Sequence, residues 1–234
     1  MNQYLEPTEL LDYESQNITK LVNARGWRQI DNYSKILQIY NFVKDEISFG
    51  YNIDDAIKSS RVLSDGYGQC NTKGILFMSL LRSVGIPCRI HGFTIDKKLQ
   101  KGAMTGLVYT LAPKSIIHSW VEVNFEDRWL KLEGFILDRP YLTQLQKKFS
   151  KSDDQFCGYG VATNHFKKPE VDWDNNDTYI QKEGINRDFG IFNDPDTFFM
   201  KHNQALSPIK KWFYQNFARK LMNNNVTKIR KGNY

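Results

Sequence analysis

Apolar residues recur every three or four positions along several segments, a spacing typical of helices that bury one face. Residues 34–48 follow this pattern, with Ser34 as the expected N-terminal cap. Residues 70–84 are apolar on nearly every face, which predicts a buried helix that ends at Gly85. A weaker pattern predicts another helix over residues 140–149.

Two segments alternate between apolar and polar residues, which is the pattern of a strand with one buried face. Residues 117–125 read IHSWVEVNF and residues 128–133 read RWLKLE, with Glu126 and Asp127 between them as a tight turn. Together they predict an antiparallel hairpin. Residues 88–95 predict a further strand.

Two other segments lack a clear period. Residues 96–114 contain Gly102, Gly106 and Pro113 and predict a long loop that covers another part of the protein. Residues 150–200 are rich in Asp, Asn, Gly and aromatic residues, and we expect them to wrap around the body.

Residues 66–70 read Gly-Tyr-Gly-Gln-Cys and stand directly before the buried helix. The glycines let the backbone turn sharply, which places Cys70 at the N-terminal end of the helix. The N–H groups and the dipole at that end favour the negatively charged thiolate. Cys70 is therefore a candidate nucleophile, and a buried core cysteine is the alternative.

A nucleophilic cysteine needs a base that takes its proton and a third group that orients the base. His118 begins the first strand of the predicted hairpin, and Glu133 ends the second. With the turn at residues 126–127, His118 pairs with roughly residue 135. The side chains of His118 and Glu133 are then diagonal neighbours, about 7–8 Å apart at the backbone. A register shift of one residue would place them on opposite faces.

Three blocks, in this order, make the chain resemble the transglutaminase-like branch of the papain-like cysteine enzymes. In the first block, residues 68–70 (GQC) and 81–89 (LRSVGIPCR) match the family's G-x-C and R-x-x-G-I-P-x-R. Residues 118–123 (HSWVEV) match its H-x-W-V-E-V strand. Residues 129–133 (WLKLE) stand where the family has a Trp followed by an Asp. The resemblance covers about residues 34–138.

The resemblance implies an α+β fold with a papain-like core, in which the nucleophile helix packs on an antiparallel sheet. Carried over to this chain, it makes Cys70 the nucleophile, His118 the general base and acid, and Glu133 the orienting carboxylate. Glu133 departs from the family's usual Asp, and Asp138 is the fallback for that role. The backbone N–H of Cys70 would bind the oxyanion, with Tyr51 as a candidate second donor.

The function that the resemblance implies is cysteine-dependent acyl transfer from an amide through a thioester. Transfer to water makes the protein a protease or amidase, and transfer to an amine makes it a transglutaminase or ligase. The substrate would be a peptide, a protein or a small amide. A non-catalytic protein-binding module on the same scaffold is the alternative. An arylamine N-acetyltransferase-like enzyme is disfavoured, because the R-G-G-x-C-x-E approach to its cysteine is absent.

No cofactor or metal is expected from the motifs. The sequence has no CxxC, HExxH or DxDxDG pattern, which disfavours structural zinc and a calcium-activated crosslinker. The three cysteines, Cys70, Cys88 and Cys157, cannot all pair, so a disulfide scaffold is not expected. We interpret Cys88 as inert packing and Cys157 as structural or incidental.

The charge of the chain is concentrated at its C-terminal end. Residues 201–234 carry +8 and no acidic residue, so residues 1–200 sum to −2 of the net +6. We expect a catalytic domain over residues 1–200, which does not bind nucleic acid, and a basic helical extension over residues 201–234. The absence of a signal peptide or transmembrane pattern predicts a cytoplasmic protein.

The extension has three interpretations. Residues 203–222 show a helical stripe of apolar residues, made of Ile209, Trp212, Phe213, Phe217 and Leu221. The first interpretation is that this stripe packs on the body and leaves the lysines in solvent. The others are contact with an anionic surface and disorder after Asn223. The oligomeric state is left open.

Overall fold

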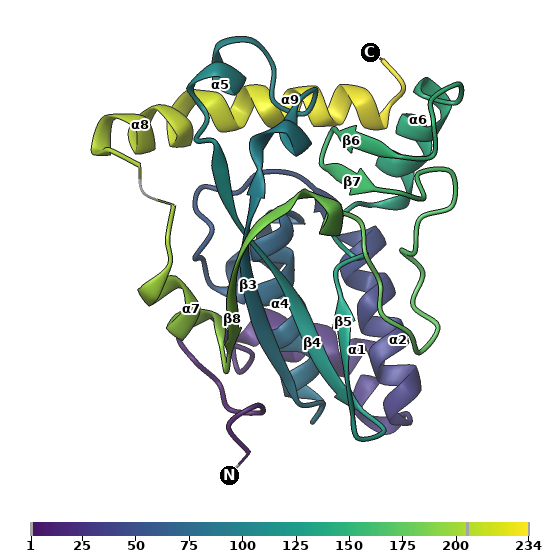
Figure 1. The fold of residues 1–234 in the computed structure, drawn as a ribbon. Helices are drawn as coiled ribbons and strands as arrows, with labels where there is room; N and C mark the ends of the chain where they lie inside the picture. The colour runs from purple at the N-terminus through teal and green to yellow at the C-terminus, as the bar shows by residue number, and fades with distance from the viewer. Residues whose placement is uncertain (1, 205, 234) are drawn as a thin grey trace.

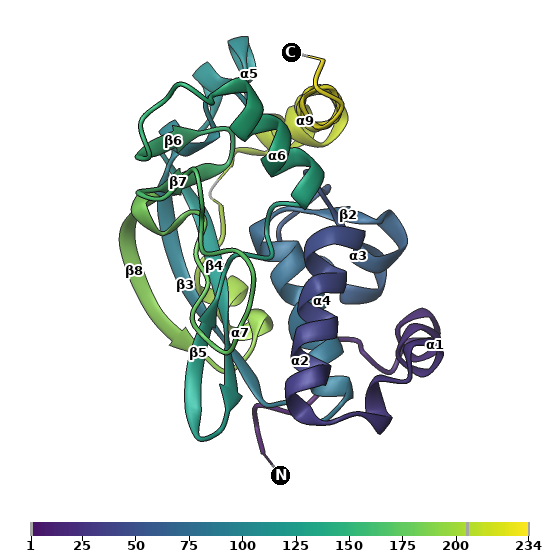
Figure 2. The same cartoon turned by 90° about the vertical axis from the view of Figure 1, so that its right-hand side faces the viewer.

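The computed structural model describes residues 2–204 and 206–233, and its main sheet has four antiparallel strands. Figure 1 shows their order in space, β5 (Arg128–Leu132), β4 (Ser115–Phe125), β3 (Cys88–Asp96) and β8 (Ile185–Phe192). Figure 2 shows the first four helices together on one side of this sheet. They are α1 (Gln16–Arg25), α2 (Asn32–Asn41), α3 (Ser59–Asp65) and α4 (Cys70–Ser83). The predicted α+β fold is therefore confirmed.

Smaller elements connect and cover these two layers. Between the helices lie η1 (Trp27–Gln29), η2 (Phe42–Glu46), β1 (Ser48–Phe49) and β2 (Tyr67–Gly68). Between the strands lie η3 (Lys97–Gln100), α5 (Gly106–Leu111), α6 (Arg139–Lys148), β6 (Phe156–Gly158), β7 (Val161–Thr163) and η4 (Lys182–Gly184). The C-terminal part is formed by α7 (Pro195–Lys201), α8 (Pro208–Phe213), η5 (Tyr214–Ala218) and α9 (Arg219–Arg230).

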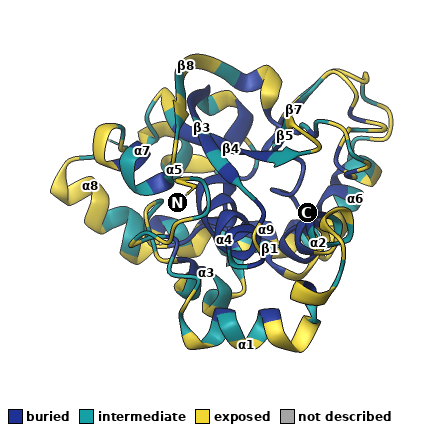
Figure 3. Ribbon diagram, turned by 90° about the horizontal axis from the view of Figure 1, so that it is seen from below, coloured by how far each residue is buried: buried dark blue, intermediate teal, exposed yellow. Residues whose placement is uncertain are grey.

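The central helix α4 is buried along nearly its whole length, as the sequence predicts. It packs against β4, and Figure 3 shows both elements in the buried interior. Even its lysine is inside the protein: Nζ of Lys73 donates hydrogen bonds to the carbonyls of Lys44 and Ile136. These two bonds connect α4 to η2, which precedes it in the chain, and to the segment that follows β5.

The predicted hairpin register is confirmed. Glu126 and Asp127 both have positive φ, which is the conformation of a two-residue hairpin turn. Phe125 pairs with Arg128 and Val121 with Leu132, the pairing that the sequence predicts.

Two predictions in the N-terminal half need correction. Asp31, and not Ser34, caps α2, because its side chain accepts the backbone N–H of Ser34. Residues 96–114, predicted as a loop, contain the short helices η3 and α5.

The segment 150–200 also differs from the prediction, because it adds a strand to the main sheet. β8 pairs with β3 over residues 185–192 and so forms one edge of the sheet. A Cβ on Gly92 of β3 would lie 2.1 Å from the Phe198 ring. Because Gly92 has no side chain, α7 can pack closely on the sheet.

The C-terminal helix packs on the body, but through a different stripe from the one predicted. Ala218, Met222, Val226 and Ile229 are buried, and three of them belong to the main hydrophobic core. The predicted packing stripe instead contains exposed residues, and Figure 3 shows α8 largely exposed. Disorder after Asn223 is contradicted, because α9 continues to Arg230. Within the described ranges, we find no helix with the length and apolar character to cross a bilayer.

Candidate active site

Cys70 is the first residue of α4, and the turn before it is held by hydrogen bonds. Gln69 is the N-cap: its side chain accepts a backbone N–H in the first turn, and its own N–H donates to Oγ1 of Thr72 at 3.0 Å. Gly68 allows this closeness, because a Cβ there would lie 2.6 Å from the Thr72 hydroxyl. Gly66 has a positive φ of 69° and ends α3. The sequence before Cys70 therefore fixes the thiol at the helix N-terminus.

His118 and Glu133 form a fully buried pair. Nε2 of His118 lies 2.7 Å from Oε1 of Glu133, and neither side chain is exposed. His118 lies on β4 opposite Phe93 of β3, and Glu133 directly follows β5. The structure thus brings these two residues together as the hairpin register predicts.

The second oxygen of Glu133 is held by the backbone. Oε2 accepts the N–H of Ile180 at 2.8 Å and the N–H of Gln181 at 2.9 Å. The carboxylate therefore has three hydrogen-bond donors and a fixed orientation. Sequence reasoning missed both partners, because a backbone N–H leaves no side-chain signature.

The environment of His118 favours its protonated form. Burial alone lowers the pKa of the imidazole, but Cys70 and Glu133 outweigh burial and raise that pKa to about 10. Nδ1, the nitrogen that Glu133 does not use, has no hydrogen-bond partner among the described residues. It is therefore free to take the proton of the Cys70 thiol. A cation at His118 beside Cys70 would stabilise negative charge on the sulfur.

Asn71 links the nucleophile helix to both neighbours of His118. Its Nδ2 donates to the carbonyl of Ile117 at 3.1 Å, and its Oδ1 accepts from the hydroxyl of Ser119 at 2.9 Å. All three residues are buried, so these bonds hold Cys70 and His118 at a fixed separation. The sequence signal for this role is the amide residue directly after Cys70.

Asp55 lies against both residues that flank Cys70. Its Oδ1 accepts from Nε2 of Gln69 and from Nδ2 of Asn71, both at 3.0 Å. Burial raises the pKa of Asp55, although these two amides oppose the shift. Asp55 is thus a carboxyl group beside the candidate nucleophile that the sequence motifs did not identify.

The remaining candidates have other contacts. The hydroxyl of Tyr51 donates to Oε1 of Gln100 at 2.6 Å, and burial, with a smaller effect from Cys70, raises its pKa. Asp138 caps α6 and pairs with Arg230 at 2.7 Å, so its carboxylate has a structural role. Burial raises the pKa of Cys88 to about 11, which favours an inert thiol. Cys157 is exposed, and all three thiols are free.

The thiol of Cys70 is nearly closed off from solvent. Cys70 is 7% exposed. Two surface hollows lie elsewhere. One, of about 220 Å³, is lined by residues from the range 162–183, and the other, of about 760 Å³, by residues from the ranges 128–130 and 168–177. Cys70 lines neither of them. No group of three or more His, Cys, Asp or Glu side chains that could hold a metal ion occurs in residues 2–204 and 206–233.

Residues 24–134 match the family model of the transglutaminase-like superfamily. This segment includes Cys70, His118 and Glu133 but ends before Ile180. Among the curated proteins, none matches the sequence.

Among solved structures, the fold is similar to that of a "Putative Cysteine Protease" from Cytophaga hutchinsonii, with a TM-score of 0.46 and 14% identity. The match covers 82% of this chain and 47% of the other, so this chain spans about half of that protein's length.

Proposed function

We propose that the protein, whose residues 24–134 match the model of the transglutaminase-like superfamily, is a cysteine-dependent acyl-transfer enzyme. It acts on an amide or peptide bond through a thioester on Cys70. The observation that carries the proposal is the buried hydrogen bond between His118 and Glu133, next to a thiol at a helix N-terminus. This is the arrangement of nucleophile, base and orienting carboxylate that acyl transfer requires.

The first half of the reaction forms the thioester. The Cys70 thiolate attacks the carbonyl carbon, and the oxygen takes up negative charge. The backbone N–H of Cys70 supports that charge, because the first N–H groups of a helix have no partner within the helix. The imidazolium of His118 then gives its proton to the leaving amine as the carbon–nitrogen bond breaks.

The second half releases the acyl group. Neutral His118 takes a proton from the incoming water or amine, which attacks the thioester carbon. The carbon–sulfur bond breaks, and the thiolate–imidazolium pair is restored. The three hydrogen bonds of Glu133 keep its carboxyl group in the same orientation throughout, so that the ring of His118 stays in place.

Labelling with iodoacetamide at neutral pH, followed by mass mapping, tests the activated thiol. Cys88 is a buried control and Cys157 an exposed one within the same chain. We expect Cys70 to react faster than Cys157 although it is much less exposed, and we expect His118→Gln to remove this advantage. Equal or slower labelling of Cys70 would show that the thiol is not activated.

Trapping of the intermediate tests the reaction itself. The protein is mixed with a panel of peptide amides, with or without a primary amine, and quenched in acid. We expect the intact mass to rise by one acyl group, and we expect Cys70→Ala to abolish the adduct. The near-complete burial of Cys70 favours the alternative, a non-catalytic binding module on the same scaffold. Absence of both adduct and turnover across the panel would support that alternative.

A further inference from the structure

The outer face of the C-terminal helix combines large apolar side chains with lysines. Along α8, η5 and α9, Ile209 is 80% exposed, Trp212 59%, Phe217 50% and Leu221 59%. The helix exposes Lys211, which forms an ion pair with Asp54 of the body at 2.7 Å. Its other exposed lysines are Lys210, Lys220 and Lys228. Residues 201–234 contain no acidic residue that could neutralise these three. We call the four apolar side chains and these lysines the basic–apolar face.

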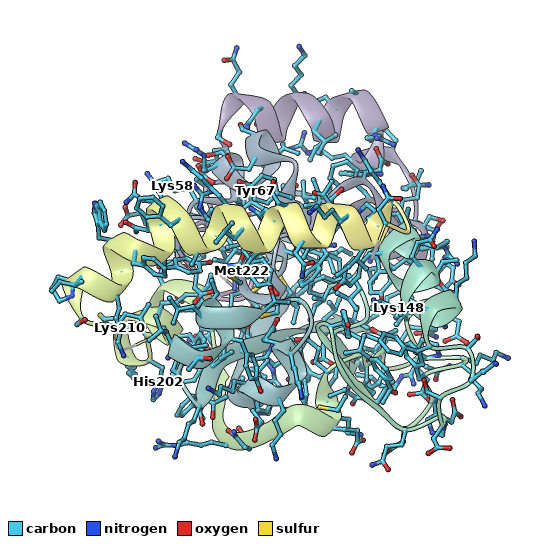
Figure 4. All side chains as sticks on the ribbon, turned by 90° about the horizontal axis from the view of Figure 1, so that it is seen from above. Lys58, Tyr67, Lys148, His202, Lys210 and Met222 are labelled. Carbon is cyan, nitrogen blue, oxygen red and sulfur yellow. The ribbon has the colours of Figure 1, made fainter. Side chains whose placement is uncertain are left out.

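The helix is anchored so that this face stays outside. Its opposite side is buried in the core through Met222, Val226 and Ile229. Asn223 exchanges two hydrogen bonds with the backbone of Tyr51, at 2.7 and 3.0 Å. Turning the basic–apolar face inward would break these contacts. Figure 4, seen from above, shows the helix lying across this end of the molecule, with Lys210 labelled beside α8.

A second element extends the apolar surface at the same end. Figure 1 shows α5 at the same end of the molecule as the C-terminal helix. Nδ2 of Asn225 donates to the carbonyls of Gly102 and Ala103, just before α5, at 2.7 and 2.9 Å. α5 exposes Leu107 and Leu111, which are 66% and 47% accessible. This end of the molecule thus exposes six large apolar residues from α5 and the C-terminal helix.

We propose that the basic–apolar face docks the protein on an anionic lipid membrane. Lysines attract acidic headgroups, and aromatic and aliphatic side chains of the same helix enter the boundary between headgroups and acyl chains. A duplex nucleic acid would satisfy the lysines but would leave Ile209 and Leu221 in water. The combination of both kinds of side chain therefore favours lipid. The docking is independent of the chemistry at Cys70.

Trp212 provides a direct probe of the docking. It is the exposed tryptophan, since Trp27, Trp120 and Trp173 are buried and Trp129 is half-buried. Vesicles of phosphatidylcholine mixed with phosphatidylserine should shift the tryptophan emission of the full chain to the blue, and pure phosphatidylcholine vesicles should not. Trp212→Phe should keep binding in sedimentation with vesicles but lose the emission shift.

Matched variants separate the apolar and the charged contributions. Removing one lysine near an anionic surface weakens binding about fivefold, so Lys220→Gln should do so and Lys20→Gln, on α1, should not. Loss of an inserted indole should weaken binding about tenfold, so Trp212→Ala should do so and Met200→Ala, an exposed residue of α7, should not.

Three results would overturn the proposal. The first is no sedimentation with anionic vesicles at low salt. The second is binding to these vesicles that Trp212→Ala leaves unchanged, because adsorption by charge alone needs no apolar insertion. The third is tighter binding to duplex DNA than to the vesicles, which would identify the face as a nucleic-acid surface.

Discussion

Nε2 of His118 lies 2.7 Å from Oε1 of Glu133, and neither side chain is exposed to solvent. The backbone also holds the pair, because Oε2 of Glu133 accepts the N–H groups of Ile180 and Gln181. The glutamate thus fixes both the position of the ring and the nitrogen that remains for Cys70.

Replacing Glu133 by Gln should separate orientation from packing. The amide can still accept the two backbone N–H groups, but it turns an NH₂ towards His118 and favours the wrong tautomer of the ring. We expect kcat/KM to fall by about 10³–10⁴ with the Tm little changed, measured by turnover and by thermal melting. Glu126→Gln, in the exposed hairpin turn, is the control. Near-normal turnover in Glu133→Gln would contradict an orienting role.

The pH dependence of turnover should report the state of His118. Its pKa is raised to about 10, so the imidazolium that protonates the leaving amine persists in alkaline solution and is lost as the pH rises through that value. We expect kcat/KM to fall on an alkaline limb near pH 10. A falling limb centred near pH 7 would show that the protonated ring is not the acid. The rate of Cys70 alkylation, measured over the same pH range, is the companion readout.

Asn71 should act as a positioning residue. Asn71→Ala removes the links to Ile117 and Ser119 and should lower kcat about 10- to 100-fold, with KM little changed. Asn71→Asp should be worse, because a second carboxylate then faces Asp55. Ser119→Ala breaks one link only and should have a smaller effect. An equal loss of stability in all three variants without a change in kcat would show a structural role alone.

A second histidine should make stability depend on pH. Burial lowers the pKa of His91, but hydrogen bonds with Glu122 at 3.0 Å and Asp188 at 2.8 Å outweigh burial and raise it above 6.5. When the pKa of a histidine is higher in the folded than in the unfolded state, its protonated ring stabilises the fold. This stabilisation is complete at a pH below the unfolded-state pKa, and it disappears as the pH rises through the folded-state pKa. His91→Gln should therefore cost about 0.5–1 kcal/mol at about pH 6 and less at about pH 9.

Urea unfolding at the two pH values measures this difference. His165→Gln is the matched control, because that side chain lies on the surface and its nearest carboxylate is 3.9 Å away. An equal loss of unfolding free energy at both pH values in His91→Gln would show that the ring contributes packing alone. Its stacking on Phe93, with ring centroids 4.3 Å apart, would then be the main interaction.

The hairpin and the helix that begins at Cys70 could be predicted from the sequence because local rules determine them. Alternation fixes the strand faces, and a two-residue turn fixes the register, so the contact between His118 and Glu133 follows. β8 could not be predicted, because an edge strand that reads Asn186-Arg187-Asp188 is polar on both faces. Its pairing depends on β3, which is far away in sequence.

The C-terminal helix shows a different limit. It carries two apolar stripes, one with Trp212, Phe217 and Leu221 and one with Met222, Val226 and Ile229. Periodicity predicts a helix in either case, but only the shape of the body decides which stripe fits against it. The stripe with the larger aromatic residues is the one that remains exposed.

The hydrogen bonds from residues 180 and 181 to Glu133 determine how much of the chain must be synthesised before the candidate site is complete. A nascent chain that ends before Ile180 already contains Cys70, His118 and Glu133. It leaves one carboxylate oxygen without the two donors that it has in the finished protein, and an unpaired buried charge is costly. Since the ribosome adds about 5–20 residues per second, several seconds separate Glu133 from its last partners. The pair of His118 and Glu133 therefore reaches its final arrangement only after residues 180 and 181 have been added.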